Sequence, residues 1–557
     1  MREGLIHASR ITFGLASIGE RGIRGAMKCR VALLAACLGA CLPSVMHSQS
    51  YDVIIRHGRI VDGSGNPAFF GDLAVKDGKI AAIGRVAGKA KQQLDATGLV
   101  VAPGFIDVHT HADEVAEMPL AENFVRMGVT TVVVGNCGGS TLNVAKLFRA
   151  IEATNVAVNV ATLIGHNSVR EKAMGGSFDR PPTAAEMKVM KALVGQAMKE
   201  GAVGLSTGLI YQPGVFSQTD EIVELAKAIT PYDGIYASHM RHEDNQIYQA
   251  LDEVFRVARE AGVRAEVSHI KLSGPSCWGQ AEKVLAYIEK ARAEGLDVTQ
   301  DQYAYTASST GLSQLLPEWA LEGGREAFQK RLADPEQKAK MVAQMKRSLR
   351  VKGRTDFSYA VIASCRQDKS LNGLNIAEAA KVKRGADTVD DQIETVLEIQ
   401  AHGGGSGVFH GMSEEDLKVF LRHPNTMVAC DSGLRKLGEG VPHPRGYGNN
   451  ARVLARYVRE QKVLRLEDAI RKMTSLPANS FQFKHRGELR EGNWADLVVF
   501  DPEKVVDTST YKDPHHYAEG FRDVLVNGVP VILDGKHTQA KAGQALRHLA
   551  TASAKRN

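Results

Sequence analysis

The sequence predicts an α/β fold, a distorted (β/α)8 TIM barrel with a small β-sandwich domain formed from both chain ends and an insertion between barrel strands 7 and 8. Three observations support this prediction. Apolar strands alternate with amphipathic helices through the middle of the chain. Both ends carry short strands separated by Asp-Gly or Asn-Gly turns. The last two expected strands lie more than a hundred residues apart, between Tyr303 and Met427, which is too long for a structureless loop.

Length and composition are those of a globular protein with more than one domain. The chain has 557 residues, of which 44% are hydrophobic and 24% are charged. The formal net charge of +6 is not gathered in a long basic run, so the sequence indicates no nucleic-acid partner. We expect a small-molecule substrate, and the sequence leaves the oligomeric state open.

The N-terminal segment predicts export to the periplasm. Residues 27–30 are a short basic region, and residues 31–41 are an apolar stretch too short to cross a bilayer as a mature helix. We therefore interpret residues 1–50 as upstream sequence and signal peptide. Two kinds of processing stay open, because residues 48–50 suit a signal peptidase and residues 38–41 resemble a lipobox, which would make the mature protein a lipoprotein. No later segment is predicted to span a membrane.

Cysteine usage indicates no disulfide framework. The chain has seven cysteines, and three of them belong to the N-terminal segment. The other four are widely spaced along the chain. A free thiol in an oxidising compartment needs a reason, and metal ligation would supply one for Cys137. The four are Cys137, Cys277, Cys365 and Cys430.

The two chain ends are predicted to build one β-sandwich, with residues 51–104 as its first part and residues 484–547 as its second. Asp77 and Asn527 each precede a glycine between two short strands, which is a strong hairpin signal. We expect residues 548–557 to form a frayed tail.

The barrel is predicted over residues 105–483, with an inserted subdomain at about residues 320–410. Eight apolar segments, each of strand length, supply its strands. In chain order they are residues 105–109, 130–135, 156–164, 203–206, 234–239, 264–269, 297–303 and 427–431.

The first of these strands lies within the sequence Pro-Gly-Phe-Ile-Asp-Val-His-Thr-His, residues 103–111, which ends in two histidines. Alternate residues of a strand point the same way, so the imidazoles of His109 and His111 face one side. Two neutral imidazoles that converge from one strand end suit a Zn²⁺ ion. In a (β/α)8 barrel this end of the strand lies at the mouth, where such barrels carry out their chemistry.

Four further residues of metal-ligand type lie at the ends of predicted barrel strands or just after them. Each alone would usually be a buried structural residue. Because all of them are expected at the same mouth as the two histidines, their joint placement indicates a metal site. They are Cys137, His239, His269 and Asp431.

These motifs resemble those of the amidohydrolase superfamily, which are metal-dependent hydrolases on a distorted (β/α)8 barrel. Within it, the chain is similar to the D-aminoacylase (N-acyl-D-amino-acid deacylase) branch from residue 51 to about residue 547. Many members with two metals bridge them with a carboxylated lysine from the fourth barrel strand. Here the fourth strand and its flanks, residues 201–208, contain no lysine, and the resemblance implies that the thiolate of Cys137 takes that place. The other matching motifs are Ser-His at 238–239, Ser-His-x-Lys at 268–271, Asp-Gln-Tyr-x-Tyr at 301–305, Asp-Ser-Gly at 431–433 and His-Pro-Arg-x-Tyr-Gly at 443–448.

The resemblance implies a zinc enzyme. It implies that Cys137, His239 and His269 bind one Zn²⁺ tightly, with one coordination position open for water or substrate. His109 and His111 would form a second, weaker metal site.

The activity that the resemblance implies is hydrolysis of the amide bond of N-acyl-D-amino acids to a carboxylate and a free D-amino acid. Zinc would polarise the carbonyl and lower the pKa of its water. Asp431 would act as general base and acid, taking the proton of the water and passing it to the leaving nitrogen. The preference for the D-enantiomer comes from the resemblance alone.

A substrate with a free α-carboxylate needs cations and hydrogen-bond donors around it. The alternative for each such residue is a solvated charge or a packing role. Residues 306–324 contain leucines and a tryptophan but no Lys or Arg, which favours neutral or apolar side chains over D-Asp and D-Glu. The expected substrate-binding residues are Lys271, Tyr211, Tyr303, Tyr305 and Arg445.

Two other functions stay open. The first is a related amidohydrolase of dihydropyrimidinase or dipeptidase type, acting on cyclic amides or dipeptides. The second belongs to another class, a non-catalytic barrel kept for binding. Such scaffolds typically lose metal ligands, whereas ligand-type residues fill all six positions here.

Overall fold

The computed structural model describes residues 50–548. The predicted export signal and nearly all of the predicted tail lie outside these residues and stay predictions. Among the helices described, none combines the length and the apolar character needed to cross a membrane.

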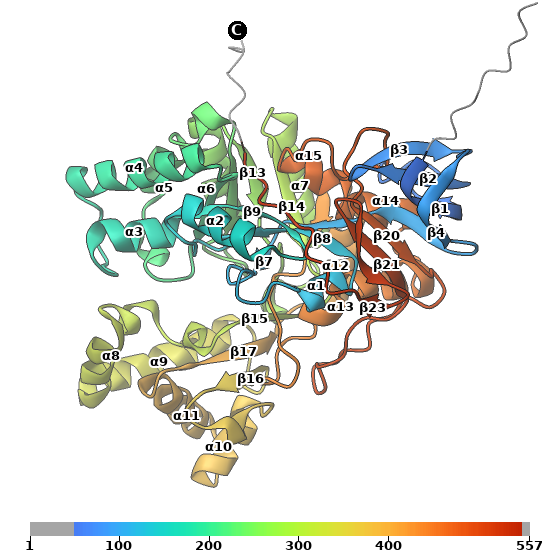
Figure 1. The fold of residues 1–557 in the computed structure, drawn as a ribbon. Helices are drawn as coiled ribbons and strands as arrows, with labels where there is room; N and C mark the ends of the chain where they lie inside the picture. Colours follow the sequence, from blue (N-terminus) through green and yellow to red (C-terminus); the bar gives the residue numbers. More distant parts are fainter. Residues whose placement is uncertain (1–49, 549–557) are drawn as a thin grey trace, which may run out of the picture. The chain divides into compact units, whose positions relative to one another are not determined.

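Parallel strands in the middle of the chain form the predicted distorted barrel (Figure 1). Each strand pairs in parallel with the next, and a break at Leu163 divides the third strand into two short segments. In pairing order the strands are β6 (Phe105–Asp107), β8 (Val129–Val134), β9 (Asn159–Thr162) with β10 (Ile164–Gly165), β11 (Gly204–Gly208), β12 (Ile235–His239), β13 (Arg264–Val267), β14 (Val298–Gln302) and β18 (Thr426–Val428).

The barrel closes where its first and last strands meet. Strand β7 (Thr110–His111) continues the first strand, β19 (Ser432–Gly433) continues the eighth, and the two pair in parallel. Just before this pair, the backbone N–H of Asp431 donates to the His109 carbonyl at 2.9 Å. The backbone N–H of Cys430 donates to the Asp107 carboxylate at 3.0 Å. These contacts join strands that lie more than three hundred residues apart in the sequence.

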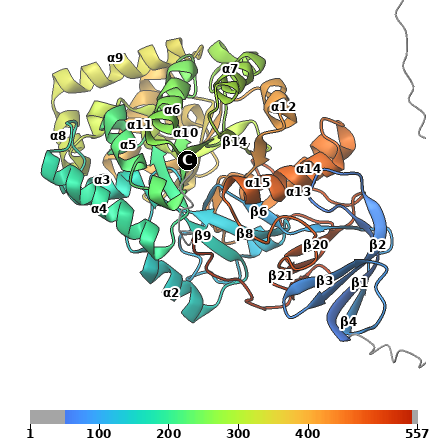
Figure 2. The same cartoon turned by 90° about the horizontal axis from the view of Figure 1, so that it is seen from above.

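Helices follow the strands, and α4 and α7 lie at the periphery in Figure 2. Their apolar residues recur every three or four positions, as in α6, where Leu251, Val254 and Ala258 are buried. Between strands the helices are α1 (Glu122–Val125), α2 (Val144–Thr154), α3 (His166–Met174), α4 (Ala184–Glu200), α5 (Thr219–Ala226), α6 (Ile247–Ala261), α7 (Ala281–Ala293) and α12 (Glu414–Arg422). After the last strand come α13 (Arg445–Arg452), a π-helix at Val453–Glu460, α14 (Leu466–Met473) and α15 (Ser475–Ser480). Short 3₁₀ helices are η1 (Gly214–Phe216), η2 (Thr230–Tyr232), η3 (Pro275–Cys277), η4 (Leu312–Leu315), η5 (Glu318–Leu321) and η6 (Lys369–Leu371).

The insertion lies between β14 and α12, in the loop after the seventh strand, and therefore at the barrel mouth. It has its own apolar core, which includes Phe328, Met341 and Ile393. It begins earlier than residue 320, because Ala307 already pairs with the strand that ends the insertion. Its strands are β15 (Ala307–Gly311), β16 (Ala360–Cys365) and β17 (Gly405–His410), and its helices are α8 (Gly324–Ala333), α9 (Pro335–Val351), α10 (Ile376–Arg384) and α11 (Val389–Ala401).

The two chain ends form one nine-stranded sheet. Its N-terminal and C-terminal halves meet where β5 pairs antiparallel with β20, and both halves contribute to one core, as Leu73 and Leu525 show. The N-terminal strands are β1 (Ser50–Ile60), β2 (Phe69–Lys76), β3 (Lys79–Gly84), β4 (Lys89–Asp95) and β5 (Val100–Pro103). The C-terminal strands are β20 (Leu497–Phe500), β21 (Phe521–Val526), β22 (Val529–Leu533) and β23 (Lys536–His537).

A buried charge links this sheet to the barrel, and its removal tests the link. The Asp496 carboxylate forms an ion pair with Arg486 and accepts a hydrogen bond from Asn159 of β9 at 3.2 Å. We expect Asp496→Asn to lower the free energy of unfolding by about 3–5 kcal/mol, because it leaves a buried guanidinium without its counter-charge. The control is Glu439→Gln, which breaks a solvent-exposed pair with Lys436 and should leave the stability nearly unchanged. The midpoint temperature of thermal unfolding compares the two variants with the wild type. Equal midpoints for Asp496→Asn and Glu439→Gln would contradict the expectation.

Candidate functional site

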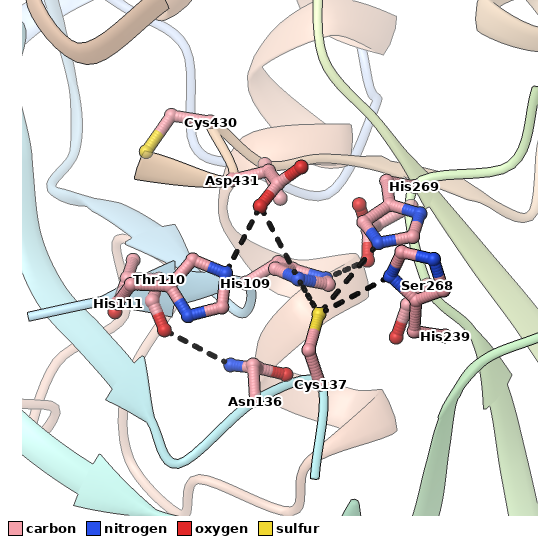
Figure 3. Close-up of polar contacts among 12 residues, drawn as sticks. His109, Thr110, His111, Asn136, Cys137, His239, Ser268, His269, Cys430 and Asp431 are labelled. Atoms are coloured by element: carbon pink, nitrogen blue, oxygen red, sulfur yellow. Dashed lines mark hydrogen bonds and ion pairs between the residues drawn. The ribbon is translucent and has the colours of Figure 1, made fainter. Parts of the chain in front are cut away.

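The six predicted ligand-type residues converge at the barrel mouth (Figure 3). Their donor atoms form three overlapping groups, and within each group all donor atoms lie within 4.8 Å of one another. The groups are His109, His111 and Cys137; Cys137, His239 and His269; and His109, His269 and Asp431. Two of the three groups share Cys137, so this thiol lies between two adjacent metal positions.

Cys137 is the centre of the cluster. Its Sγ lies 3.3 Å from Nε2 of His109, 3.5 Å from Nδ1 of His239 and 3.7 Å from Nε2 of His269. Burial opposes ionisation of the thiol, but the charge of His109 and hydrogen bonds from the surrounding imidazoles outweigh it and hold the pKa of Cys137 well below its ordinary value. A thiolate surrounded by imidazole nitrogens is a donor set that fits Zn²⁺.

The backbone at three of these residues has a left-handed conformation. The φ angle is +52° at Cys137, +36° at His269 and +50° at Asp431. Residues other than glycine adopt the left-handed region at a cost of about 1–3 kcal/mol each, and such residues cluster at functional sites. The surrounding structure therefore stabilises an unfavourable backbone conformation at three residues whose side chains belong to the donor cluster.

A buried acid, Asp301, positions His109. Nδ1 of His109 lies 3.1 Å from Oδ2 of Asp301, and both side chains are fully buried. Burial and the neighbouring Asp301 charge raise the pKa of Glu266, a second buried acid beside this pair, well above its ordinary value. A hydrogen bond from Nδ1 to Asp301 leaves Nε2 of His109 facing Cys137, as a metal ligand requires.

Glu243 supports the other two histidines and was not among the predicted site residues. Its Oε1 lies 3.1 Å from Nδ1 of His269 and 3.9 Å from Nε2 of His239. In each imidazole this is the nitrogen opposite the one that faces Cys137. The carboxylate is therefore placed to orient the His269 ring through a short contact, and it supplies a negative charge beside the His239 ring. A carboxylate four residues after a strand-end histidine was the sequence signal available for it.

Asp431 lies among the same donors. Its Oδ1 is 3.1 Å from Nε2 of His111 and 3.6 Å from Nε2 of His109, and its Oδ2 accepts from Arg445 at 2.9 Å. Burial disfavours its charge, but the Arg445 guanidinium and the histidines overcome this and hold the pKa of Asp431 well below its ordinary value. The carboxylate is therefore ionised in the cluster.

A cavity of about 780 Å³ opens over the cluster, and two of the expected substrate-binding residues line it. The ring of Tyr211 lies 4.8 Å from that of His239, and its hydroxyl accepts from Thr310 at 3.0 Å. Lys271 also lines the cavity, but its ammonium donates to Glu243 at 2.5 Å. The insertion forms the opposite wall of the cavity, and the predicted covering segment contributes residues such as Leu316 to it.

The other three expected substrate-binding residues do not line the cavity. Arg445 lies behind Asp431, with its guanidinium 4.5 Å from the centre of the Tyr303 ring. Tyr303 is fully buried, and its hydroxyl donates to the sulfur of Met412. Tyr305 is not brought to the site, because its hydroxyl donates to Asp507 in the C-terminal segment. Arg445 and Tyr303 thus lie behind the Asp431 carboxylate, on the side away from the cavity.

Known proteins match almost the whole of the described chain. A model of the amidohydrolase family matches residues 92–372 and 435–532. The chain is 35% identical over 529 residues to the D-aminoacylase of Alcaligenes xylosoxydans xylosoxydans, which covers 90% of this chain and 99% of that protein. One similar solved structure is N-acyl-D-glutamate deacylase from Bordetella bronchiseptica, in complex with zinc and a phosphonate inhibitor that mimics the tetrahedral intermediate. Its TM-score is 0.75 and its sequence is 34% identical, and the match covers 90% of this chain and 100% of that chain. Another is a D-aminoacylase whose binuclear metal centre is described as having one-metal activation and second-metal attenuation. Its TM-score is 0.76 and its sequence is 33% identical, and the match covers 89% of this chain and 100% of that chain.

The shared position of Cys137 predicts unequal effects of removing ligands. We expect Cys137→Ser to weaken zinc binding by at least about a hundredfold, because it removes the soft donor common to two groups. His111→Ala should leave one tightly held ion, because His111 belongs to only one group. Competition with a chromogenic chelator measures the affinity. Cys277→Ser is the matched control, since burial raises the pKa of the Cys277 thiol to about 11 and it lies outside the cluster. Equal affinities of Cys137→Ser and wild type would exclude this assignment.

Removal of the Glu243 carboxylate tests its supporting role. We expect Glu243→Gln to weaken zinc binding about 10–100-fold, the usual cost of losing a group that orients a ligand. Glu243→Asp should recover part of the loss. The same competition measures the affinity, and the absorption spectrum of the cobalt-substituted protein reports the ligand geometry. An unchanged affinity and spectrum would show that His239 and His269 are held without it.

Proposed function

Because the chain belongs to the amidohydrolase family, we propose that it hydrolyses the amide bond of N-acyl-D-amino acids, releasing a carboxylate and a free D-amino acid. The observation that carries this proposal is the donor group of Cys137, His239 and His269 beside Asp431, at one end of a cavity of substrate size. The D-aminoacylase and the N-acyl-D-glutamate deacylase named above support the class of reaction and the D-configuration.

The cofactor is zinc, which the thiolate and imidazole donors fit. Cys137, His239 and His269 would hold the main ion, and His109 and His111 would hold a second ion beside Cys137. When bound, zinc polarises the scissile carbonyl and lowers the pKa of water. The related binuclear centre, in which one metal activates and a second attenuates, supports one working ion.

Asp431 holds and transfers the proton. Its carboxylate accepts the proton of the attacking water and delivers it to the amide nitrogen, which leaves as a neutral amine. Arg445 and His111 contact different oxygens of this carboxylate, so they fix its orientation through both steps. Because Arg445 is almost fully buried, its counter-charge stays in place while substrates enter and leave.

Lys271 and Tyr211 bind the α-carboxylate of the substrate. Both line the cavity beside the donor cluster, and Nζ of Lys271 lies 2.7 Å from Nδ1 of His269. Their place beside the cluster orients the amino-acid end of the substrate toward Asp431. The apolar residues Leu315 and Leu316 line the same cavity and favour neutral side chains at the D-amino acid.

Hydrolysis of N-acetyl-D-methionine and its L-enantiomer by the zinc-loaded protein tests this function. We expect release of methionine from the D-enantiomer with a strong preference over the L-enantiomer. Asp431→Asn should lower kcat about 10²–10⁴-fold while zinc stays bound, because it removes the proton carrier and leaves the Cys137 group intact. Zinc-loaded protein that hydrolyses neither enantiomer would reject the acyl-amino-acid substrate and favour dipeptides or cyclic amides.

A further inference from the structure

Helix α9 of the insertion carries positive charges both toward α11 and toward the cavity, and of these only the charges toward α11 form ion pairs. Lys338 and Lys346 form ion pairs with acidic residues of α11, at 2.8 and 2.6 Å. Lys340 and Arg347 line the active-site cavity instead. Within residues 50–548, neither of these two forms an ion pair. The cations that face the protein are neutralised, and those that face the cavity are not.

The cavity-lining residues of α9 form one continuous face. They recur at intervals of three and four, the spacing of one side of a helix, and this face has no acidic residue. Lys340 is held in place, because its ammonium lies 4.5 Å from the centre of the Trp319 ring, and the indole N–H donates to Gln344 at 2.9 Å. The face consists of Lys340, Ala343, Gln344, Arg347, Ser348 and Val351.

The outer part of the cavity has an excess of positive charge. The acids near the donor cluster are already neutralised, since Glu243 pairs with Lys271 and Asp431 pairs with Arg445. Arg241 also lines the cavity but pairs with an acid of α6. The remaining charged lining residues are the cations Lys340, Arg347, Lys352 and Arg354 and the acids Asp244 and Glu318. A cleft with such an excess attracts anions.

The same cavity has an apolar lining. Pro317, Tyr359 and Phe409 contribute to its wall, apart from the two leucines already assigned to the amino-acid side chain. An aliphatic or peptide chain would bury apolar surface against these side chains. At about 780 Å³, the cavity is in the size range that holds drug-sized ligands, and it exceeds the needs of a short acyl group.

We propose that the site takes substrates whose acyl group is an extended chain that ends in a negative charge, such as the half-amide of a dicarboxylic acid or an acidic peptidyl group. This inference rests on the proposed function. Lys271 and Tyr211 keep the α-carboxylate beside the donor cluster, and Leu315 and Leu316 take the amino-acid side chain, so the acyl group is the part of the substrate left to extend along the cavity. Its terminal anion lies against Lys340 and Arg347, and its stem lies against the apolar wall.

Two matched substrates test the proposal, N-hexanoyl-D-methionine and N-adipoyl-D-methionine, which differ only in a carboxylate at the end of a six-carbon acyl chain. We expect kcat/KM to be about five- to tenfold higher for the adipoyl compound at low salt. The advantage should shrink as salt screens the exposed charges, because the screening length falls below about 10 Å above 0.1 M.

Substitution of the cations assigns the effect to α9. The double variant Lys340→Gln with Arg347→Gln should bring the adipoyl-to-hexanoyl ratio close to one. Both side chains are exposed, so the fold is retained. Lys346→Gln is the matched control on the other side of the same helix, and it should keep the ratio of the wild type.

Two results would overturn the proposal while leaving the proposed function intact. One is equal kcat/KM for the two substrates in the wild type, and the other is a ratio that the double variant leaves unchanged, in each case with N-acetyl-D-methionine still hydrolysed. Failure to hydrolyse any N-acyl-D-amino acid would instead reject the proposed function, and this inference with it.

Discussion

The arrangement of the donor groups depends on how the first and last barrel strands close on each other. The hydrogen bond from the Asp431 N–H to the His109 carbonyl fixes the register of the two strand ends. The buried Asp107 carboxylate joins the same two strands, because it accepts a hydrogen bond from the backbone N–H of Cys430. Burial raises the pKa of this carboxyl to about 7. Because closure brings the eighth strand beside the first, Asp431 comes to lie against His109 and His111. The remaining donors come from strands whose positions in the ring follow from this closure.

Burial of so many ionisable groups at one place requires that their charges be matched. Each negative group in the cluster has a positive or proton-donating neighbour: Arg445 for Asp431, Lys271 for Glu243 and His109 for Asp301. An uncompensated buried charge would cost several kcal/mol, so the loss of one partner affects the rest. Charge matching therefore extends to residues behind the donor cluster, such as Arg445.

The fold and the ligand-type residues were predictable because these residues lie at or just after the ends of apolar strand segments, as His239 ends β12 and Asp431 lies three residues after β18. Other features depend on contacts that spacing does not reveal. Glu243 acquires its role only when the loop after β12 folds back over His269. Tyr305 is drawn from the site by a residue of the C-terminal segment. The insertion starts at Ala307 because a polar Ala-Ser-Ser-Thr-Gly strand without an apolar pattern finds a partner about a hundred residues later.

The pairing of β5 with β20 places a constraint on the order in which the molecule can form. Val100 finds its partner Phe500 only after 400 further residues have been made. At about 5–20 residues per second, this delay is on the order of 20–80 s. Throughout that time β5 has an unpaired edge, and such edges are prone to pair with other chains. A chain interrupted anywhere before β20 keeps that edge open permanently, so an incomplete copy stays prone to association with other chains.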